Sequence, residues 1–231
     1  MARSAILLIL SIICLAQQLV TAFPRPEADN EEAKPAEIDY RTLLQSSLLD
    51  TIALIQNHTS LILREEGQFV ADLLAGVNEI PEKSAYIQEF ISKLKSILER
   101  KEKLDLQDIS PEVLNEKAAI ITAIAEVFED ISRIALREDD SSETVMLKNV
   151  IYKLDLIGLN DRIKNSEKEA VQKFEVTCKR LLNSLGEQES KERKVLSEWF
   201  SNFQAKESDI KKYGSFVEFI RFVQALIIQN I

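Results

Sequence analysis

SPEVLNEKAAIITAIAEVFEDISRIALR, residues 110–137, is the stretch that decides the fold class. Ser110 can cap a helix, Pro111 suits the first helical position, and Glu112 faces the positive end of the helix dipole. Apolar residues then recur at the three- and four-residue steps of one helix face, at Ile120, Ile121, Ile124, Val127, Phe128, Ile131 and Ile134. The stretch therefore predicts a long helix with one buried side.

The same pattern occurs on both sides of this stretch. From Tyr40 onward, one face carries Leu44, Leu48, Ile52, Ile55 and Ile62. A second piece of this first helical unit is predicted over residues 65–76. Further helices are predicted over residues 84–100, 143–156, 161–185, 190–204 and 216–231, with Gly158 ending one helix and Gly214-Ser215 opening the last. We expect an all-α fold, an irregular antiparallel bundle of about six to seven helices without disulfides.

The N-terminal segment has the pattern of a secretory signal peptide. Arg3 precedes the apolar run of residues 5–15, and Val20-Thr21-Ala22 forms a small-residue cleavage site. We expect a signal peptide over residues 1–22, a disordered acidic Pro-containing arm over residues 23–39, and a single helical domain over residues 40–231. Because the apolar run is too short to span a bilayer, a secreted, extracellular protein without a transmembrane segment is predicted.

Charge and cysteine content limit the partners. Cleavage would remove one of the 29 basic residues, Arg3, and none of the 38 acidic ones, so the net charge would change from −9 to −10. Such a chain repels phosphate backbones, which argues against a nucleic-acid partner. Cleavage would also remove Cys14 and leave Cys178 alone, so no intrachain disulfide is expected.

Motifs for catalysis and metal binding are scarce. His58 is the sole histidine, and no Gly-rich nucleophile elbow lies near it, so a boundary histidine is the favoured interpretation. No Glu-x-x-His or His-Glu-x-x-His motif occurs, and neither acidic cluster, Asp105–Asp108 nor Asp139–Glu143, has the glycine of an EF-hand loop. We predict no catalytic residues, no cofactor and no metal.

Two candidate sites remain. Asn57-His58-Thr59 is the one N-glycosylation sequon, and Asn57 lies two and a half helical turns from Leu48, on the outer face. The last helix is apolar over most of its circumference, so it is either a central helix or a surface for an apolar ligand or a partner. The residues of that candidate surface are Phe216, Phe219, Ile220, Phe222, Val223, Leu226 and Ile227.

One short segment resembles a known export signal. Arg41-Thr42-Leu43-Leu44-Gln45 is similar to the Arg-x-Leu-x-acid/Gln element of malaria-type parasites, and it lies at a suitable distance after the signal peptide. The resemblance covers five residues and implies a parasite-type effector exported into a host cell. Helix periodicity also accounts for Leu44.

Three functions follow from these features. The leading hypothesis is a secreted, non-enzymatic helical protein that binds an extracellular macromolecular partner, because the chain combines a stable scaffold with no convergent polar site. The alternative is a secreted carrier of lipids or other apolar small molecules. The exported effector is the further alternative.

Overall fold

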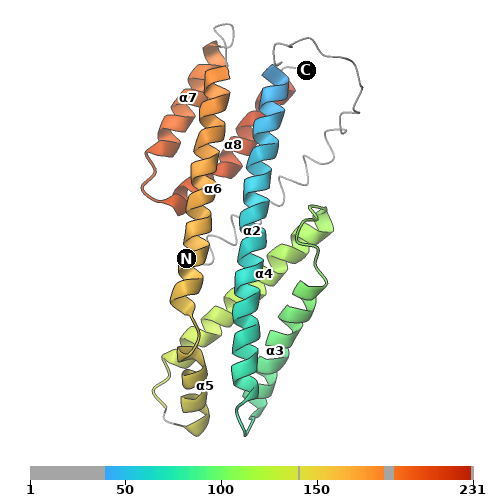
Figure 1. Cartoon of the computed structure of the whole chain (residues 1–231), viewed down its shortest axis with the longest axis vertical. Helices are drawn as coiled ribbons and strands as arrows, with labels where there is room; N and C mark the ends of the chain where they lie inside the picture. The colour runs from blue at the N-terminus through green and yellow to red at the C-terminus, as the bar shows by residue number, and fades with distance from the viewer. Residues whose placement is uncertain (1–39, 140, 185–189, 230–231) are drawn as a thin grey trace. The chain divides into compact units, whose positions relative to one another are not determined.

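The computed structural model describes residues 40–229, apart from residue 140 and residues 185–189. These residues form seven helices and no strand, which confirms the predicted all-α fold (Figure 1). The helices are α2 (Tyr40–Asn78), α3 (Ala85–Glu102), α4 (Pro111–Ala135), α5 (Ser142–Tyr152), α6 (Leu156–Ser184), α7 (Ser190–Gln204) and α8 (Asp209–Gln229). The predicted signal peptide and acidic arm lie outside the described residues.

The described chain divides into two compact units, and both α2 and α6 contribute to each of them. Unit 1 is Thr59–Asn165, which holds the later part of α2, all of α3, α4 and α5, and the start of α6. Unit 2 holds residues 40–58 and 166–229, and so the first part of α2, the rest of α6, α7 and α8. The single domain expected from the sequence stays a prediction.

Unit 1 has a largely aliphatic core. Its helices α3 and α4 run antiparallel, since Lys93 pairs with Asp130 while the later Arg100 pairs with the earlier Glu116. Helix α5 packs on α4, and the absence of a side chain at Gly76 lets α2 approach Val150 of α5 closely. The large aliphatic residues of α4 that are fully or almost fully buried are Ile120, Ile121, Ile124, Val127, Ile131 and Ile134.

Unit 2 has an aromatic core. The ring of Phe174, on α6, packs against four other aromatic rings. The centroid separations are 6.0 Å to Trp199, 5.3 Å to Phe203, 4.2 Å to Phe216 and 4.9 Å to Phe219. These rings come from α7 and α8, which pack on each other. Edge-to-face and offset ring pairs stabilise a core beyond their buried area alone.

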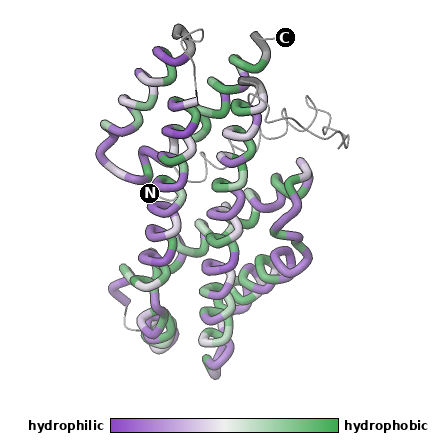
Figure 2. Tube along the Cα trace, turned by 45° about the horizontal axis from the view of Figure 1, so that its top comes forward, coloured by the Kyte–Doolittle hydropathy of each residue, from purple (hydrophilic) through white to green (hydrophobic). Residues whose placement is uncertain are grey.

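Helix α2 differs from the prediction. A break was expected near Glu65, but α2 is continuous from Tyr40 to Asn78. The buried residues Leu63, Phe69 and Val70 continue one face across the expected break, so burial keeps the helix intact. Figure 2 shows apolar and polar segments alternating along this helix.

The start of α6 also differs from the prediction. Gly158 was expected to end a helix, yet α5 ends at Tyr152 and Gly158 lies in the first turn of α6. Asp155 caps this helix, because its Oδ1 accepts a hydrogen bond from the Gly158 N–H at 2.9 Å. The N-cap is therefore Asp155, and α6 begins at Leu156 and not at residue 161 as the sequence predicted.

Helix α8 begins earlier than predicted. It starts at Asp209 and runs through Gly214, where a helix start was expected. A glycine inside a helix costs about 1 kcal/mol. Tyr213 and Phe216 are both buried on either side of Gly214, and this packing outweighs that cost.

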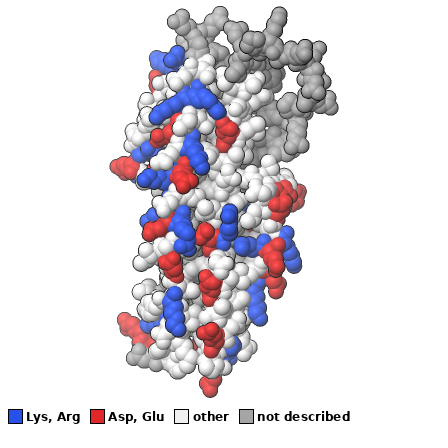
Figure 3. Space-filling model, viewed as in Figure 1, with Lys and Arg blue, Asp and Glu red and all other residues white. Residues whose placement is uncertain are grey.

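The predicted start of α4 is confirmed, with Ser110 at the N-cap position and Pro111 as the first helical residue, but the Ser110 side chain makes no capping hydrogen bond. In the described part of the chain, no helix combines the length and the apolar character that crossing a bilayer requires. On the face drawn in Figure 3, basic and acidic side chains are interspersed.

Candidate functional site

The most unusual polar site of unit 2 is a buried group that we call the His58 cluster, formed by His58, Ser166 and Tyr213. His58 of α2 is 5% exposed. Its Nδ1 lies 3.0 Å from the Ser166 Oγ of α6, and its ring meets the Tyr213 ring of α8 edge to face at 4.8 Å. The expectation of a boundary histidine is therefore wrong, because His58 lies on the buried face between Ile55 and Ile62.

Burial controls the ionisation of this cluster. It lowers the pKa of His58 from 6.5 to about 4, because an imidazolium loses its hydration in the interior. It also raises the pKa of the Tyr213 hydroxyl, and the charge of Glu167 adds to that shift. Both side chains are therefore neutral near pH 7.

The Tyr213 hydroxyl is under-satisfied. Tyr213 is 4% exposed, and within the described chain its hydroxyl has no hydrogen-bond partner. A buried polar group without a partner costs about 1–3 kcal/mol. The His58 cluster thus combines close ring packing with an energetic penalty.

The Ser166–His58 pair resembles a nucleophile and its base in distance alone. A serine nucleophile also needs hydrogen-bond donors for the developing oxyanion. Ser166 lies inside α6, where the backbone N–H groups bond to carbonyls of the preceding turn. The arrangement is better suited to joining helices than to acyl transfer.

Unit 1 contains a buried carboxyl that the sequence analysis missed. Glu66 of α2 is half-buried, three residues after Leu63 and four before Val70, both of which are fully buried. Burial raises the pKa of Glu66 from 4.5 to about 8. Its i+3 and i+4 spacing to apolar residues was the signal that could have revealed it.

A buried lysine holds the connection between α3 and α4. Lys117 is 1% exposed, and its Nζ donates hydrogen bonds to the carbonyl oxygens of Leu106 at 2.8 Å and Asp108 at 2.7 Å. The Ser60 Oγ of α2 also donates to the Leu106 carbonyl, at 3.0 Å. Burial lowers the pKa of Lys117, while Asp108 and Asp105 oppose this shift. This site fixes a loop and offers no open position for a ligand.

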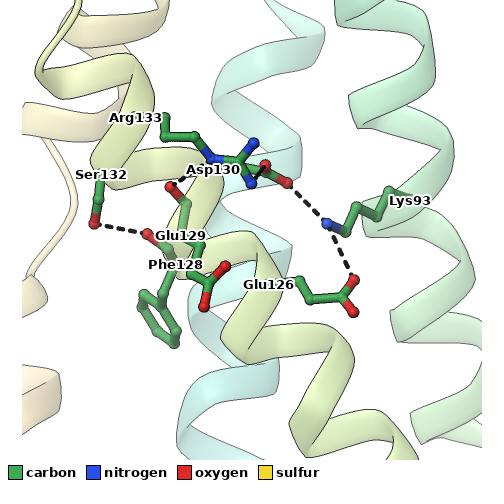
Figure 4. Close-up of polar contacts among 7 residues, drawn as sticks. All are labelled: Lys93, Glu126, Phe128, Glu129, Asp130, Ser132 and Arg133. Atoms are coloured by element: carbon green, nitrogen blue, oxygen red, sulfur yellow. Dashed lines mark hydrogen bonds and ion pairs between the residues drawn. The ribbon is translucent and has the colours of Figure 1, made fainter. Parts of the chain in front are cut away.

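An ion-pair network joins α3 to α4 on the surface of unit 1. Figure 4 shows Lys93 between Asp130 and Glu126, with Arg133 beside Asp130. The Lys93 Nζ lies 2.8 Å from one carboxylate oxygen of Asp130 and 3.5 Å from Glu126, and Arg133 lies 2.8 Å from the other oxygen of Asp130. Exposed pairs of this kind contribute about 0–1 kcal/mol each. The network supports the pairing of α3 with α4, and each of its four charged side chains has an ion-pair partner within it.

Large apolar side chains are exposed where α4, α5 and α6 succeed one another, and we call Leu136, Val145, Tyr152 and Ile157 the 136–157 surface. Leu136 is 80% exposed, Tyr152 71% and Ile157 79%. Val145 and Tyr152 are two turns apart on α5, so they share one helix face. The Lys148 Nζ donates to the carbonyl of Arg137, which brings α5 beside the end of α4.

The predicted modification site lies on α2. Asn57 is exposed, whereas Thr59 of the same sequon is buried in the folded chain. Glycosylation of Asn57 stays a prediction.

The candidate apolar surface of α8 lies mainly inside unit 2. Six of its seven residues are buried, namely Phe216, Phe219, Ile220, Val223, Leu226 and Ile227, and Phe222 is half-buried. Phe216 and Phe219 contact Phe174. The structure therefore brings these residues together as packing partners of α6 and α7.

The remaining sequence motifs lie within helix packing or helix ends. In the export-like segment, Leu44 is fully buried. In the acidic clusters, Asp108 accepts a hydrogen bond from the Ser110 N–H and Asp139 from the Ser141 hydroxyl, which lowers the pKa of both carboxyls. Across the described residues, no group of three or more His, Cys, Asp or Glu side chains is arranged to hold a metal ion.

Comparison with known proteins gives no relative. No family model matches the chain, and neither the curated proteins nor the solved structures contain a significant match.

Proposed function

We propose that this chain is a secreted, non-enzymatic helical protein that binds an extracellular protein partner through the 136–157 surface. The observation that carries the proposal is the exposure of Leu136, Tyr152 and Ile157, each more than two-thirds exposed within one short stretch of chain. Exposed apolar patches on a protein surface are typical of interaction sites, and Val145 and Tyr152 share one exposed face of α5. Tyrosine in particular is enriched among the residues that dominate binding energy.

The arrangement of polar groups supports a non-catalytic role. Ser166 lies inside α6, where the backbone N–H groups bond within the helix, and Lys117 is engaged with two carbonyl groups. Glu66 and Cys178 are separate buried groups, in unit 1 and unit 2 respectively. The placement of these polar groups therefore supports a binding role more than a catalytic one.

The aromatic packing of unit 2 favours macromolecular binding over transport of apolar molecules. The ring of Phe174 contacts those of Phe216 and Phe219 where the carrier hypothesis would place a ligand. Organic extraction of the natively purified protein tests the carrier hypothesis directly. Stoichiometric lipid in the extract, found by mass spectrometry, would favour the carrier over the binding protein.

The binding proposal is tested with a surface variant. In the variant Leu136→Gln, Tyr152→Gln and Ile157→Gln, three exposed contacts are removed without disturbing a buried side chain. The immobilised wild-type protein should retain a saturable partner from its native extracellular fluid, and the variant should bind that purified partner at least about 10-fold more weakly.

A matched variant in unit 2 controls for general surface polarity. Leu49→Gln with Val176→Gln also removes large exposed apolar side chains, at 65% and 67% exposure. This control should bind the partner as the wild type does. Equal binding by the wild type and the 136–157 variant, or equal loss in both variants, would refute the proposed site.

A further inference from the structure

The His58 cluster is the place where three helices of unit 2 meet through polar and aromatic side chains. His58 comes from α2, Ser166 from α6 and Tyr213 from α8. His58 and Ser166 form a 3.0 Å hydrogen bond, and the centroids of the His58 and Tyr213 rings lie 4.8 Å apart. Because the same imidazole makes both contacts, a change in its state acts on both helices.

We propose that His58 is an acid-sensitive contact: its neutral ring holds α6 and α8 against α2 within unit 2, and its protonation in mildly acidic surroundings weakens this packing. The inference is independent of the proposed partner-binding function, because it concerns unit 2 and not the 136–157 surface. It gives the protein a conformational response to acidic compartments or fluids.

The geometry explains why a proton is poorly accommodated. A protonated imidazole has two N–H donors and a full charge, and the ring is 5% exposed. Ser166 offers one oxygen, and the neighbouring Tyr213 presents an aromatic ring. The orphaned Tyr213 hydroxyl already adds a cost to the closed packing.

Each helix that packs around His58 carries charged groups. On α6, the charge of Glu167 acts on the Tyr213 hydroxyl. On α8, Lys212 precedes Tyr213 and pairs with Glu175 at 3.3 Å. On α2, Asp50 pairs with Arg180, two turns before His58. Among the described residues, burial is the cause of the lowered pKa of His58.

The direction of the response follows from linkage. The folded pKa of His58, about 4, lies below the unfolded value of 6.5. The unfolded or opened chain therefore binds the proton more tightly, and unit 2 loses stability as the pH falls from 6.5 towards 4. Above pH 6.5 the histidine is neutral in both states and has no such effect.

A titration of the wild-type chain tests the inference without a mutation. Because the chain has one histidine, its imidazole gives a single set of NMR resonances. The midpoint in the folded protein should lie more than one pH unit below the midpoint measured in concentrated urea. Equal midpoints in the two conditions would overturn the inference.

Urea unfolding then measures the consequence for unit 2. Trp199, the sole tryptophan, lies in the aromatic core of unit 2, so its fluorescence reports that unit. From pH 7.5 to 5.0 the unfolding equilibrium constant should rise about 30-fold more in the wild type than in His58→Gln. This comparison cancels the other titrating groups, which both proteins share.

Two further variants separate the effect of protonating His58 from the effect of its contacts with Ser166 and Tyr213. Ser166→Ala keeps the titrating ring and should retain most of the pH response, while Tyr213→Phe should retain it and remove the unpaired hydroxyl. A pH response in His58→Gln equal to that of the wild type would overturn the inference. If His58→Gln does not fold at pH 7.5, a pH response retained in Ser166→Ala, together with a lowered midpoint of the His58 titration, supports the inference. An unshifted midpoint refutes it.

Discussion

Units 1 and 2 each bury an ionisable side chain of α2, but the two side chains respond to pH in opposite directions. Unit 1 buries Glu66 and unit 2 buries His58, and burial favours the neutral form of each. A neutral carboxyl is protonated, whereas a neutral imidazole is deprotonated. Acidification therefore removes a penalty in unit 1 and creates one in unit 2.

The two cores also differ in composition. The helices of unit 1 meet mainly through Ile, Leu and Val, with one stacked ring pair between Phe69 and Phe128, whereas those of unit 2 meet around Phe174. In unit 1 many small contacts share the packing energy, while in unit 2 one ring touches four others. The comparison indicates that unit 2 depends more strongly on a few residues.

The largest expected effect is that of Phe174→Ala. Removing a fully buried ring leaves a cavity among Trp199, Phe203 and Phe216, so the free energy of unfolding should fall by about 3–5 kcal/mol. Urea unfolding followed by Trp199 fluorescence measures this loss. Val176→Ala, at a position of α6 that is 67% exposed, should change stability by less than about 0.5 kcal/mol. Similar losses in both variants would contradict the dependence of unit 2 on Phe174.

The next largest effect is that of Glu66→Gln. The folded pKa of Glu66, about 8, lies above its ordinary value of 4.5, so ionisation destabilises unit 1 increasingly as the pH rises from 4.5 to 8. Glu66→Gln should therefore raise the free energy of unfolding above that of the wild type, and this gain should be about 3 kcal/mol larger at pH 7.5 than at pH 4.5.

Urea unfolding followed by far-UV circular dichroism at both pH values checks the prediction for Glu66. Glu126→Gln, which removes an exposed carboxylate of α4, is the control and should show no comparable gain. A stability difference between Glu66→Gln and wild type that is the same at pH 4.5 and pH 7.5 would show that Glu66 ionises normally, and the contrast between the units would then fail.

A smaller effect is expected at the N-terminus of α6. Asp155→Ala removes the acceptor of the Gly158 N–H and should cost about 1 kcal/mol, measured by thermal unfolding. Asp155→Asn keeps a capping oxygen and should stay within a few tenths of a kcal/mol of wild type. If the two variants were equally unstable, the charge and not the cap would be responsible.

The smallest effect is expected in the network of Figure 4. Lys93→Met removes the bridge between Asp130 and Glu126 and should cost about 0.5 kcal/mol at low salt. Because salt screens exposed charges, the difference from wild type should shrink further in 1 M NaCl. A loss above about 2 kcal/mol in urea unfolding would mean that this network is more deeply buried than its exposed fractions indicate.

Much of the fold was predictable because one apolar face repeats along each helix. Most buried residues of α4 are those that its spacing predicted, although Phe128 is half-buried and Lys117 and Ala118 are buried as well. Pro111 starts the helix as expected. Errors occurred where local signals compete with packing. Gly158 and Gly214 suggested helix boundaries, but a cap from Asp155 and the burial of Tyr213 and Phe216 place both glycines inside helices.

The candidate sites were less predictable than the fold. Glu66 and His58 lie on apolar faces by spacing, yet His58 was interpreted as a boundary residue, and glutamate is by type a mostly exposed residue. Ser166 and Tyr213, which contact His58, lie more than a hundred residues further along the chain, so periodicity could not reveal these contacts. The exposure of Leu136 and Ile157 likewise depends on which helices cover them.

The free cysteine of α6 makes the opening of unit 2 measurable by chemistry. Cys178 is fully buried, and burial raises the pKa of its thiol, so it is protected from alkylating reagents while α6 remains packed. Alkylation must then wait for a transient opening of the surrounding helices. After correction for thiolate formation, the rate of labelling by iodoacetamide reports how often that opening occurs.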